Sequence, residues 1–251
     1  MKKLSFLLFL LLWIACKTDD VAQTLPAVKV VVPKELKEYY KEVDFTKTGN
    51  SLYVELANLT IGKHKNFLSY TDRHKHLYKA EASLKNPNNV VLVYTGEERY
   101  WKEYHSGSNP YKPQTFNTEH IYPQSKFKGD AKSDLHHLKV CDSKLNTSRS
   151  NTPFANGSGK AGRTLKGWYP GDEWKGDVAR MIMYINLRYN DKIDNNIVVG
   201  GIDVLLKWND EDPVSQLELQ RNNVIEEAQG NRNPFIDFPQ LARAAYQSYK
   251  P

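Results

Sequence analysis

The stretch NTEHIYPQSKFKGDAKSDLHHLKVCDSKLNTSRSN, from Asn117 to Asn151, decides the fold of this chain. It holds three of the chain's seven histidines, at positions 120, 136 and 137, and an adjacent pair, Glu119 and His120. A soluble chain has little structural reason to gather acidic, amide and imidazole groups in this way. The stretch therefore indicates a catalytic site, and the pattern around these groups indicates the fold that holds them.

Consecutive segments of this stretch predict strand, turn, strand and helix. Residues 116–122 are aromatic and β-branched around Glu119, and Pro123 then ends the strand. Lys128-Gly129-Asp130 predicts the turn, and residues 135–140 predict the second strand. Asp142 and Ser143 are suitable residues to cap a helix over positions 144–149. We therefore expect a ββα unit over residues 116–151.

Such a unit carries the groups that hydrolysis of a phosphodiester requires. Histidine is half-deprotonated near neutral pH, so His120 is suited to accept a proton from water. A divalent cation absorbs negative charge on the phosphate, and hard cations prefer oxygen ligands such as those of Glu119 and Asn146. Arg149 lies three residues after Asn146, on the same helical face, and can form a fork with a phosphate.

Each of these residues also has an alternative interpretation. Neighbouring strand residues point to opposite faces, so Glu119 and His120 can share a pocket only at a strand end or bend. Pro123 is consistent with such a bend. Otherwise Glu119 is a surface charge, and His120 is a hydrogen-bonded core histidine. Asn146 could instead terminate a helix, and Arg149 could form an ion pair on it.

The composition sets wider limits on function. The chain has 251 residues, of which 40% are hydrophobic and 25% charged, as in globular proteins. The net charge is +6, and removal of a leader that contains Lys2 and Lys3 would leave +4. This excess is compatible with a polyanionic partner but does not require one. The two cysteines, Cys16 and Cys141, exclude a disulfide framework and a cysteine-based zinc site.

The N-terminus predicts export. In residues 1–15 (MKKLSFLLFLLLWIA), two lysines precede an apolar run that is too short to span a bilayer, as in a signal peptide. Cys16 follows directly, as at a bacterial lipoprotein cleavage site, although Trp13 stands where leucine is usual. The alternatives are a lipid attached to Cys16 and a conventional leader with an incidental cysteine. Residues 16–34 predict a tether, in which VKVVV could add a short strand.

The remaining chain is rich in helical patterns and shows no internal repeat. Apolar spacing and turn signals predict a strand at 90–94 and helices at about 50–62, 70–84, 175–189, 213–229 and from 239 onward. His74 and His76 are expected on the solvated face of the second of these helices. The sequence thus predicts a single α+β domain over residues 35–251, helix-rich with a small antiparallel sheet.

Several blocks of the sequence resemble one known family. NTEHIYPQS, SDLHHL and LNTSRSN, in this order, are similar to blocks of the bacterial endonuclease I family of ββα-metal, or His-Me finger, nucleases. VVLVYTG at 90–96, KGDVARMIMY at 175–184 and QGNRNPFIDFP at 229–239 resemble the other blocks of this family. The resemblance covers about residues 39–238, which is nearly all of the chain after the tether.

The resemblance implies a role for particular residues. It implies that His120 is the general base, that Glu119 and Asn146 bind one Mg²⁺, with Mn²⁺ or Ca²⁺ as alternatives, and that cleavage leaves a 5′-phosphate. Relatives with a long segment between the two strands use an arginine there to steady the phosphate. That segment is short here and contains no arginine, which leaves Lys126, Lys128 and Arg149 as candidates.

Two further residues of the central stretch could support the site. We expect at most one of the two adjacent histidines near it, and we assign His136 to a supporting position around the metal. Asp134 could share this role or could tie down the turn before the second strand.

The expected protein is an exported, monomeric, metal-dependent endonuclease that cuts DNA with little sequence preference, and the sequence leaves open whether it also cuts RNA. It would be a lipoprotein of the outer membrane, cell surface or periplasm, or else secreted. The alternatives are a secreted ribonuclease on the same fold and a surface binding lipoprotein without catalysis. If the first interpretation holds, His120, Glu119 and Asn146 must share one pocket.

Overall fold

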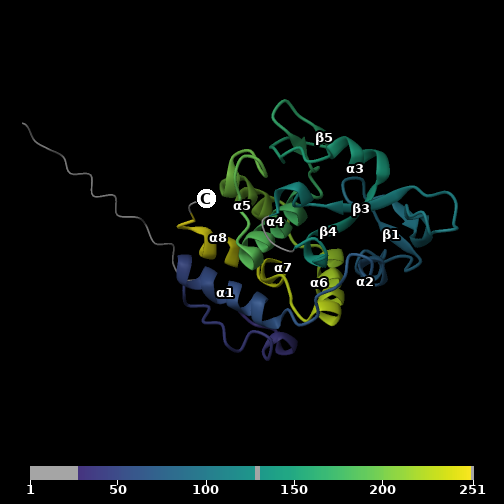
Figure 1. The fold of residues 1–251 in the computed structure, drawn as a ribbon. Helices are drawn as coiled ribbons and strands as arrows, with labels where there is room; N and C mark the ends of the chain where they lie inside the picture. The colour runs from purple at the N-terminus through teal and green to yellow at the C-terminus, as the bar shows by residue number, and fades with distance from the viewer. Residues whose placement is uncertain (1–27, 128–130, 250–251) are drawn as a thin grey trace, which may run out of the picture.

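The central element of the fold is helix α4 (Lys175–Tyr189) (Figure 1). The computed structural model describes residues 28–127 and 131–249. The sequence predicted the bounds of α4 and one apolar stripe along it. The bounds are confirmed, but the helix is buried on all sides from Gly176 to Leu187. It is enclosed because α1, α5 and α7 all pack against it, and an enclosed helix has no solvated face.

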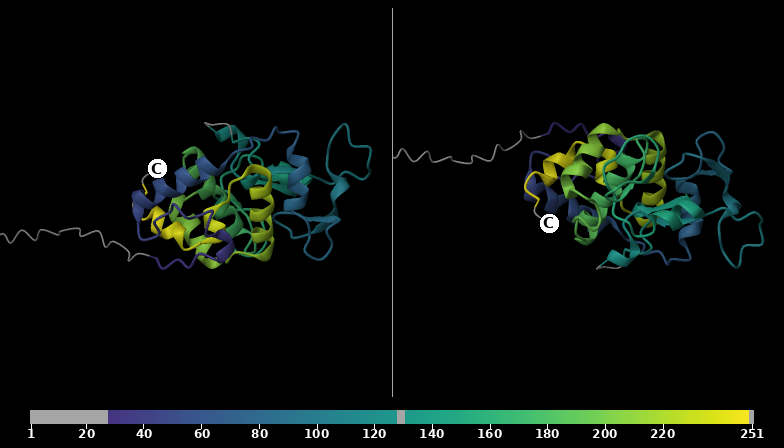
Figure 2. Two further views of the ribbon diagram at one scale, coloured as in Figure 1. Left: turned by 90° about the horizontal axis from the view of Figure 1, so that it is seen from below. Right: turned by 90° about the horizontal axis from the view of Figure 1, so that it is seen from above.

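The other helices surround α4 and run over most of the chain (Figures 1 and 2). The α-helices are α1 (Gly49–Lys63), α2 (Arg73–Ala80), α3 (Ser143–Arg149), α5 (Gly201–Glu211), α6 (Gln216–Gln229), α7 (Pro234–Asp237) and α8 (Leu241–Tyr246). Short 3₁₀ helices are η1 (Lys34–Leu36), η2 (Trp101–Glu103), η3 (Gln124–Lys126) and η4 (Leu135–His137).

Within residues 28–127 and 131–249, the strands form three separate antiparallel pairs rather than one sheet. They are β1 (Asn89–Val91) with β2 (Glu98–Tyr100), β3 (Phe116–His120) with β4 (Leu138–Asp142), and β5 (Gly162–Arg163) with β6 (Trp168–Tyr169). The connection from β2 to β3 stands out from the body at one end in both views of Figure 2. The α+β class of the single domain is confirmed.

The expected ββα unit is formed by β3, β4 and α3. The Asp142 side chain accepts hydrogen bonds from the backbone N–H groups of Lys144 and Leu145, as an N-cap residue does. The second strand was predicted three residues too early, since residues 135–137 form η4. Asp134 accepts a hydrogen bond from His136 N and so closes a turn where a strand was expected.

Helices lie on opposite faces of this hairpin. In Figure 1, α3 lies above β3 and β4, whereas α2 and α6 lie below them. Asn117 and Glu119 of β3 contact side chains of α3. Thr118 is hydrogen-bonded to Arg73 of α2, and His120 stacks on Tyr70 just before it. The alternation of the strand thus separates Glu119 from His120, as its period of two requires.

Some predicted helix ends are wrong. The second helix, expected over 70–84, is only α2. The helix expected to begin after Asp212 begins at Gln216, because Ser215 and Glu218 form a reciprocal capping box there. Its end at Gly230 is confirmed, since this residue has φ 91°. His74 does not lie on a solvated face, because its ring packs against the rings of Tyr78 and Tyr104.

The predicted signal peptide, the lipidation site at Cys16 and most of the predicted tether lie outside the described residues, and so does Lys128. Residues 28–33 of the predicted tether are described, and they form no strand. Val28, Val30 and Val32 instead pack against the core. In the described part of the chain, no helix has both the length and the apolar character needed to cross a membrane.

Candidate active site

A cavity of about 320 Å³ opens at the end of β3, beneath the last turn of α3. Its wall includes Glu119, His120, Gln124, Asn146, Arg149 and Asn151. His120 is the last residue of β3, so the cavity lies where the strand ends and can be reached from both of its faces. Glu119 and His120 therefore share one pocket although they point to opposite faces of the strand.

Glu119 is buried at the base of this cavity. Its Oε1 accepts a hydrogen bond from Tyr94 Oη at 2.8 Å and lies 3.2 Å from Arg149 Nη1. Among the described residues, no side chain donates to its Oε2. Burial raises the pKa of Glu119, and Arg149 opposes this shift. A carboxylate that is costly to keep charged gains from a further cation, so Oε2 is a suitable ligand atom.

Asn146 is held in place by its amide nitrogen. This nitrogen donates to Asn117 Oδ1 at 2.7 Å and to the carbonyl of Thr118 at 3.1 Å. Because both donor hydrogens are used in this way, the orientation of the amide is fixed and its oxygen is left for a ligand. Asn146 lies inside α3 and does not terminate the helix, which disfavours the alternative that it is only a cap.

His120 is half-buried, and its hydrogen bond to a carbonyl oxygen assigns its proton to one ring nitrogen. Its Nε2 lies 3.3 Å from the carbonyl oxygen of Lys132, which can only accept, so Nε2 donates and Nδ1 has the lone pair. Burial, followed by the neighbouring His137, lowers the pKa of His120 to about 3. The imidazole is therefore neutral at pH 7 and able to accept a proton.

The histidine whose ring lies beside that of His120 is His137, not His136. The rings of His137 and His120 are 5.4 Å apart, and His137 Nε2 donates to the carbonyl of Ala131 at 2.8 Å. His136 points into the interior, where its Nε2 donates to the carbonyl of Asn231 at 3.0 Å. We therefore transfer the supporting position from His136 to His137. Because η4 replaces the expected strand, neither histidine follows strand alternation and both are buried.

Asp134 lies in the interior and does not line the cavity. Its carboxylate accepts hydrogen bonds from Tyr184, Tyr189 and Gln229, in addition to the bond that caps η4. These contacts favour the alternative that it ties down the turn.

Of the predicted phosphate-binding cations, Arg149 and Lys126 lie within the described residues, and their surroundings differ. Arg149 is buried and donates to the carbonyls of His120 at 2.9 Å and Ile121 at 2.8 Å, besides its ion pair with Glu119. Its surroundings favour the ion-pairing alternative, in which it anchors α3 to the end of β3. Lys126 is exposed on η3, next to residues that line the cavity, and its role stays a prediction.

Sequence reasoning missed Tyr94, which holds the Glu119 carboxylate. Its φ of 75° lies in the left-handed region, which is costly for a bulky residue, by roughly 1–3 kcal/mol. Tyr94 is buried beside the site, and such backbone strain is often found at functional sites. The only signal in the sequence was its place in the family-like block VVLVYTG.

The donor set of the cavity fits a hard cation. Glu119 Oε2 and Asn146 Oδ1 are oxygen donors, and Mg²⁺ is typically bound by one or two carboxylates with waters in its other positions. No group of three His, Cys, Asp or Glu side chains suited to a metal occurs within residues 28–127 and 131–249. The residues present therefore suit an ion that keeps much of its water.

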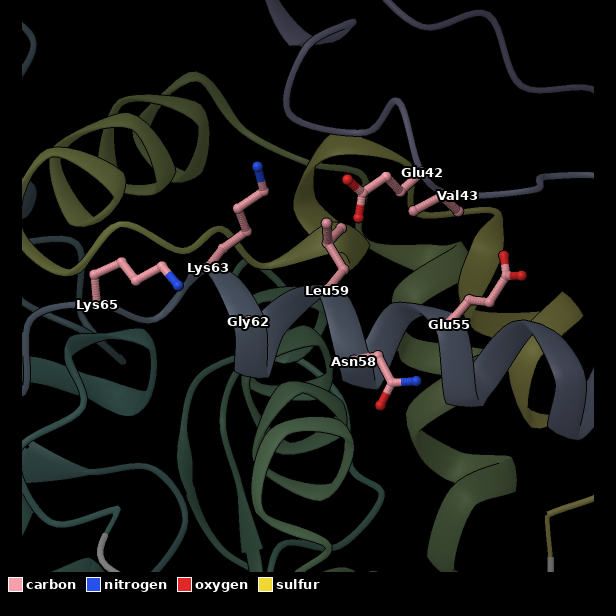
Figure 3. Close-up of a pocket in the computed structure, with 8 residues that line it drawn as sticks. All are labelled: Glu42, Val43, Glu55, Asn58, Leu59, Gly62, Lys63 and Lys65. Carbon is pink, nitrogen blue, oxygen red and sulfur yellow. The ribbon is translucent and has the colours of Figure 1, made fainter.

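Another hollow, of about 410 Å³, lies along α1 and is lined by residues between positions 42 and 65 (Figure 3). Glu42 and Glu55 lie toward one end of it, and Lys63 and Lys65 toward the other. Glu55 is already bonded to Lys47 and to the backbone of Asp44. The hollow along α1 shares no residue with the cavity at β3 and contains no histidine that could act as a base.

A β-hairpin that presents a histidine and a carboxylate, closed by a helix that presents an asparagine, defines a nuclease of the ββα class. Comparison with known proteins agrees with this class. A family model described as Endonuclease I matches residues 48–240. The chain belongs to the endonuclease I family.

Individual relatives are similar over most of their length. An extracellular ribonuclease of Bacillus amyloliquefaciens is 37% identical, over 85% of this chain and 80% of its own. An extracellular ribonuclease of Bacillus subtilis (strain 168) is also 37% identical, over 81% of this chain and 76% of its own. Endonuclease-1 of Buchnera aphidicola is 26% identical, over 67% of this chain and 88% of its own.

Proposed function

We propose that this protein is an exported, metal-dependent endonuclease that hydrolyses phosphodiester bonds of both DNA and RNA with little sequence preference. The observation that carries the proposal is the shared cavity. It brings together a neutral histidine with a lone pair on Nδ1, a carboxylate oxygen and an amide oxygen. These are the base and the hard oxygen ligands that phosphodiester hydrolysis needs.

In this proposal His120 is the general base. The Lys132 carbonyl holds Nε2–H, so that Nδ1 accepts a proton from the attacking water. A pKa of about 3 would make it a weak base. The negative charge of a bound phosphate raises the pKa of a nearby imidazole, so substrate binding would shift His120 toward the useful range.

We further propose that Glu119 and Asn146 hold one Mg²⁺, with Mn²⁺ or Ca²⁺ as possible replacements. When bound, this ion would stabilise the negative charge on the phosphoryl and leaving oxygens. Tyr94 and Arg149 would keep Glu119 in place, and Asn117 would orient Asn146. As expected for the family, the bond between the phosphorus and the 3′ oxygen would break, so that the phosphate stays on the 5′ end of the product.

The direct test is to incubate the purified protein with supercoiled plasmid and with single-stranded RNA, in Mg²⁺ and in excess chelator. We expect both substrates to be cut in Mg²⁺, neither in chelator, and activity to return when Mg²⁺ is added back. Full activity after exhaustive chelation would refute metal dependence. No cleavage of either substrate under any divalent ion would support a binding protein instead.

The metal ligands have a test of their own. Glu119→Gln and Asn146→Ala should raise the Mg²⁺ concentration for half-maximal activity by roughly tenfold or more, because the first removes the negative charge of a carboxylate ligand and the second removes an amide oxygen ligand. The matched control is Gln124→Ala, which changes an exposed residue of the same cavity. An unchanged Mg²⁺ requirement in both ligand variants would contradict this assignment.

A second candidate function is a ribonuclease with little action on DNA. It is favoured by two of the relatives, both of which are named extracellular ribonucleases. Comparing kcat/KM on duplex DNA and on RNA of matched length distinguishes the two. A large preference for RNA would replace the broader proposal.

The same relatives support the proposal of export, together with the leader-like residues 1–15. We extend this to a lipid anchor on Cys16, which mass spectrometry of the N-terminal peptide would test. We also propose that the protein acts as a monomer, because Glu119, His120 and Asn146 already meet within one ββα unit.

A further inference from the structure

Much of the net positive charge of this chain lies in one segment, and Arg73 of that segment reaches the wall of the cavity. Residues 63–79 contain five Lys or Arg residues and one acidic residue, which gives a net charge of +4. The full sequence has a net charge of +6, and Lys2 and Lys3 of the leader supply two of these charges. The rest of the chain is therefore neutral overall. A local excess of this kind marks the surface that a polyanion would approach.

Arg73, the first residue of α2, joins this segment to the cavity wall. Its Nε donates to Thr118 Oγ1 at 3.1 Å, and Thr118 lines the cavity. The guanidinium carbon lies 3.5 Å from the centre of the Tyr70 ring, a cation–π contact. Arg73 is thus held in a defined position one side chain away from the candidate active site.

The Tyr70 ring also contacts the proposed base and a second cation. It stacks with the His120 ring at 5.6 Å and an interplanar angle of 20°. Lys132 Nζ lies 4.9 Å from the centre of the same ring, and the Lys132 carbonyl binds His120 Nε2. Two cations therefore surround one aromatic ring that is stacked on the histidine.

Neither cation is neutralised within the described part of the chain. Arg73 is hydrogen-bonded to the Thr118 hydroxyl and the Tyr70 carbonyl, both uncharged, and has no carboxylate within ion-pair distance. Lys132 is exposed and also lacks such a partner. Arg149, in contrast, is paired with Glu119. Burial lowers the pKa of Arg73, because the positive charge is removed from water without a carboxylate beside it. A bound anion would supply the missing negative charge.

We propose that Arg73 and Lys132 bind a backbone phosphate of the substrate strand, adjacent to the phosphate that is cut, on the His120 side of the cavity. This subsite rests on the proposed nuclease function. A guanidinium suits the role because it can donate two parallel hydrogen bonds to phosphate oxygens, and Arg73 Nη2 has no bond within the described residues. The ammonium of Lys132 adds a second charge to the same anion.

The first experiment compares Arg73→Gln and Lys132→Gln with Lys79→Gln. The control removes the same charge from an exposed position of the same helix. On a short oligonucleotide, Arg73→Gln should lower kcat/KM about tenfold, mostly through KM, because one charge-assisted phosphate contact is lost. The slope of log(kcat/KM) against log(salt) should fall by about 1 for each true phosphate contact. Lys79→Gln should change both quantities little.

A second substrate separates phosphate binding from a role in positioning His120. In this oligonucleotide, methylphosphonate linkages flank one central phosphodiester, so the cut phosphate has no charged neighbour. Arg73→Gln should lose little activity on it relative to wild type. Arg73→Lys, which keeps the charge, should partly restore the rate on the all-phosphate substrate, and equal unfolding midpoints would show that the variants fold.

Equal losses on both substrates would overturn the subsite, since Arg73 would then act through Tyr70 and His120. The subsite would also be overturned if the wild type is active and Arg73→Gln and Lys132→Gln change kcat/KM and its salt dependence as little as Lys79→Gln does. That result would leave the nuclease proposal intact. A wild-type protein that cuts neither substrate would instead refute the nuclease proposal itself.

Discussion

Two clusters of buried charge meet at one step of the β3–β4 hairpin. Glu119 and Lys139 lie directly opposite each other across the two strands. Glu119 belongs to the site cluster, which is Glu119, His120, Asn146 and Arg149. Lys139 belongs to what we call the interior cluster, which is Glu81, Lys139, Asp177, Arg180, Glu218 and Arg221.

The two clusters are alike in electrostatics but differ in access. Burial raises the pKa of Glu119 in one and of Asp177 in the other. The site cluster opens on a cavity. In the interior cluster no side chain is more than 5% exposed, and its three basic and three acidic groups pair with one another. A shifted pKa therefore does not identify a functional site by itself; a perturbed group must also be reachable by substrate.

The largest effect should separate the site cluster from the rest of the molecule. His120→Ala should lower the cleavage rate about 10³-fold, as removal of a general base does. It should leave the free energy of unfolding nearly unchanged, because His120 is only half-buried. Rates and urea unfolding measured on the same preparations test both parts, with His76→Ala as the control. Wild-type activity in His120→Ala would refute the assignment of His120 as the general base.

The reverse behaviour is expected in the interior cluster. Arg221 pairs with Glu81 and donates to the Leu138 carbonyl at 2.7 Å. Arg221→Met should lower the free energy of unfolding by about 3–5 kcal/mol, because it removes one of the two buried cations paired with Glu81 and also the donor to the Leu138 carbonyl. Arg243→Met is the control: its pair with Asp210 is about half exposed, so roughly 1 kcal/mol or less is expected. A mild effect of Arg221→Met, comparable to the control, would mean that the interior cluster is not structural.

A smaller effect concerns the histidines beside the interior cluster. Burial lowers the pKa of His136 and of His137 to about 4, below the value of about 6.5 in an unfolded chain. Between these values the unfolded state binds more protons, so stability falls as the pH drops from about 6.5 toward 4. The loss should be about 2 kcal/mol per histidine by pH 5.

Urea midpoints at pH 7 and pH 5 measure this loss. His136→Gln, which cannot take up the proton, should make the midpoint less dependent on pH. A midpoint that does not change with pH in the wild type would show that these histidines can be protonated in the folded protein.

Much of the site was predictable because its signals are local. Asp142 caps α3 through its own backbone neighbours, and the spacing from Asn146 to Arg149 follows from helix geometry. The choice between His136 and His137 was not predictable in this way. It depends on η4, which forms because Asp134 is fixed by Tyr184 and Gln229 from distant parts of the chain.

The arginines near the site also differ in whether local sequence signals could identify them. Sequence reasoning favoured Arg149, since it lies on the helix that carries Asn146, and it gave no reason to consider Arg73. Arg73 reaches the site only because α2 packs below the hairpin and Tyr70 stacks on His120. Forty-five residues separate Arg73 from Thr118, so no local pattern could report their contact.

The sequence by itself determined the ββα unit, the bounds of α4 and the set of residues from which an active site could be built. Periodicity and capping depend on neighbours within a few residues, and these are visible in the sequence. Tertiary structure alone decided which buried charges face a cavity and which are sealed against one another. That outcome depends on how distant helices pack over the two faces of a hairpin, because packing determines which side chains water and substrate can reach.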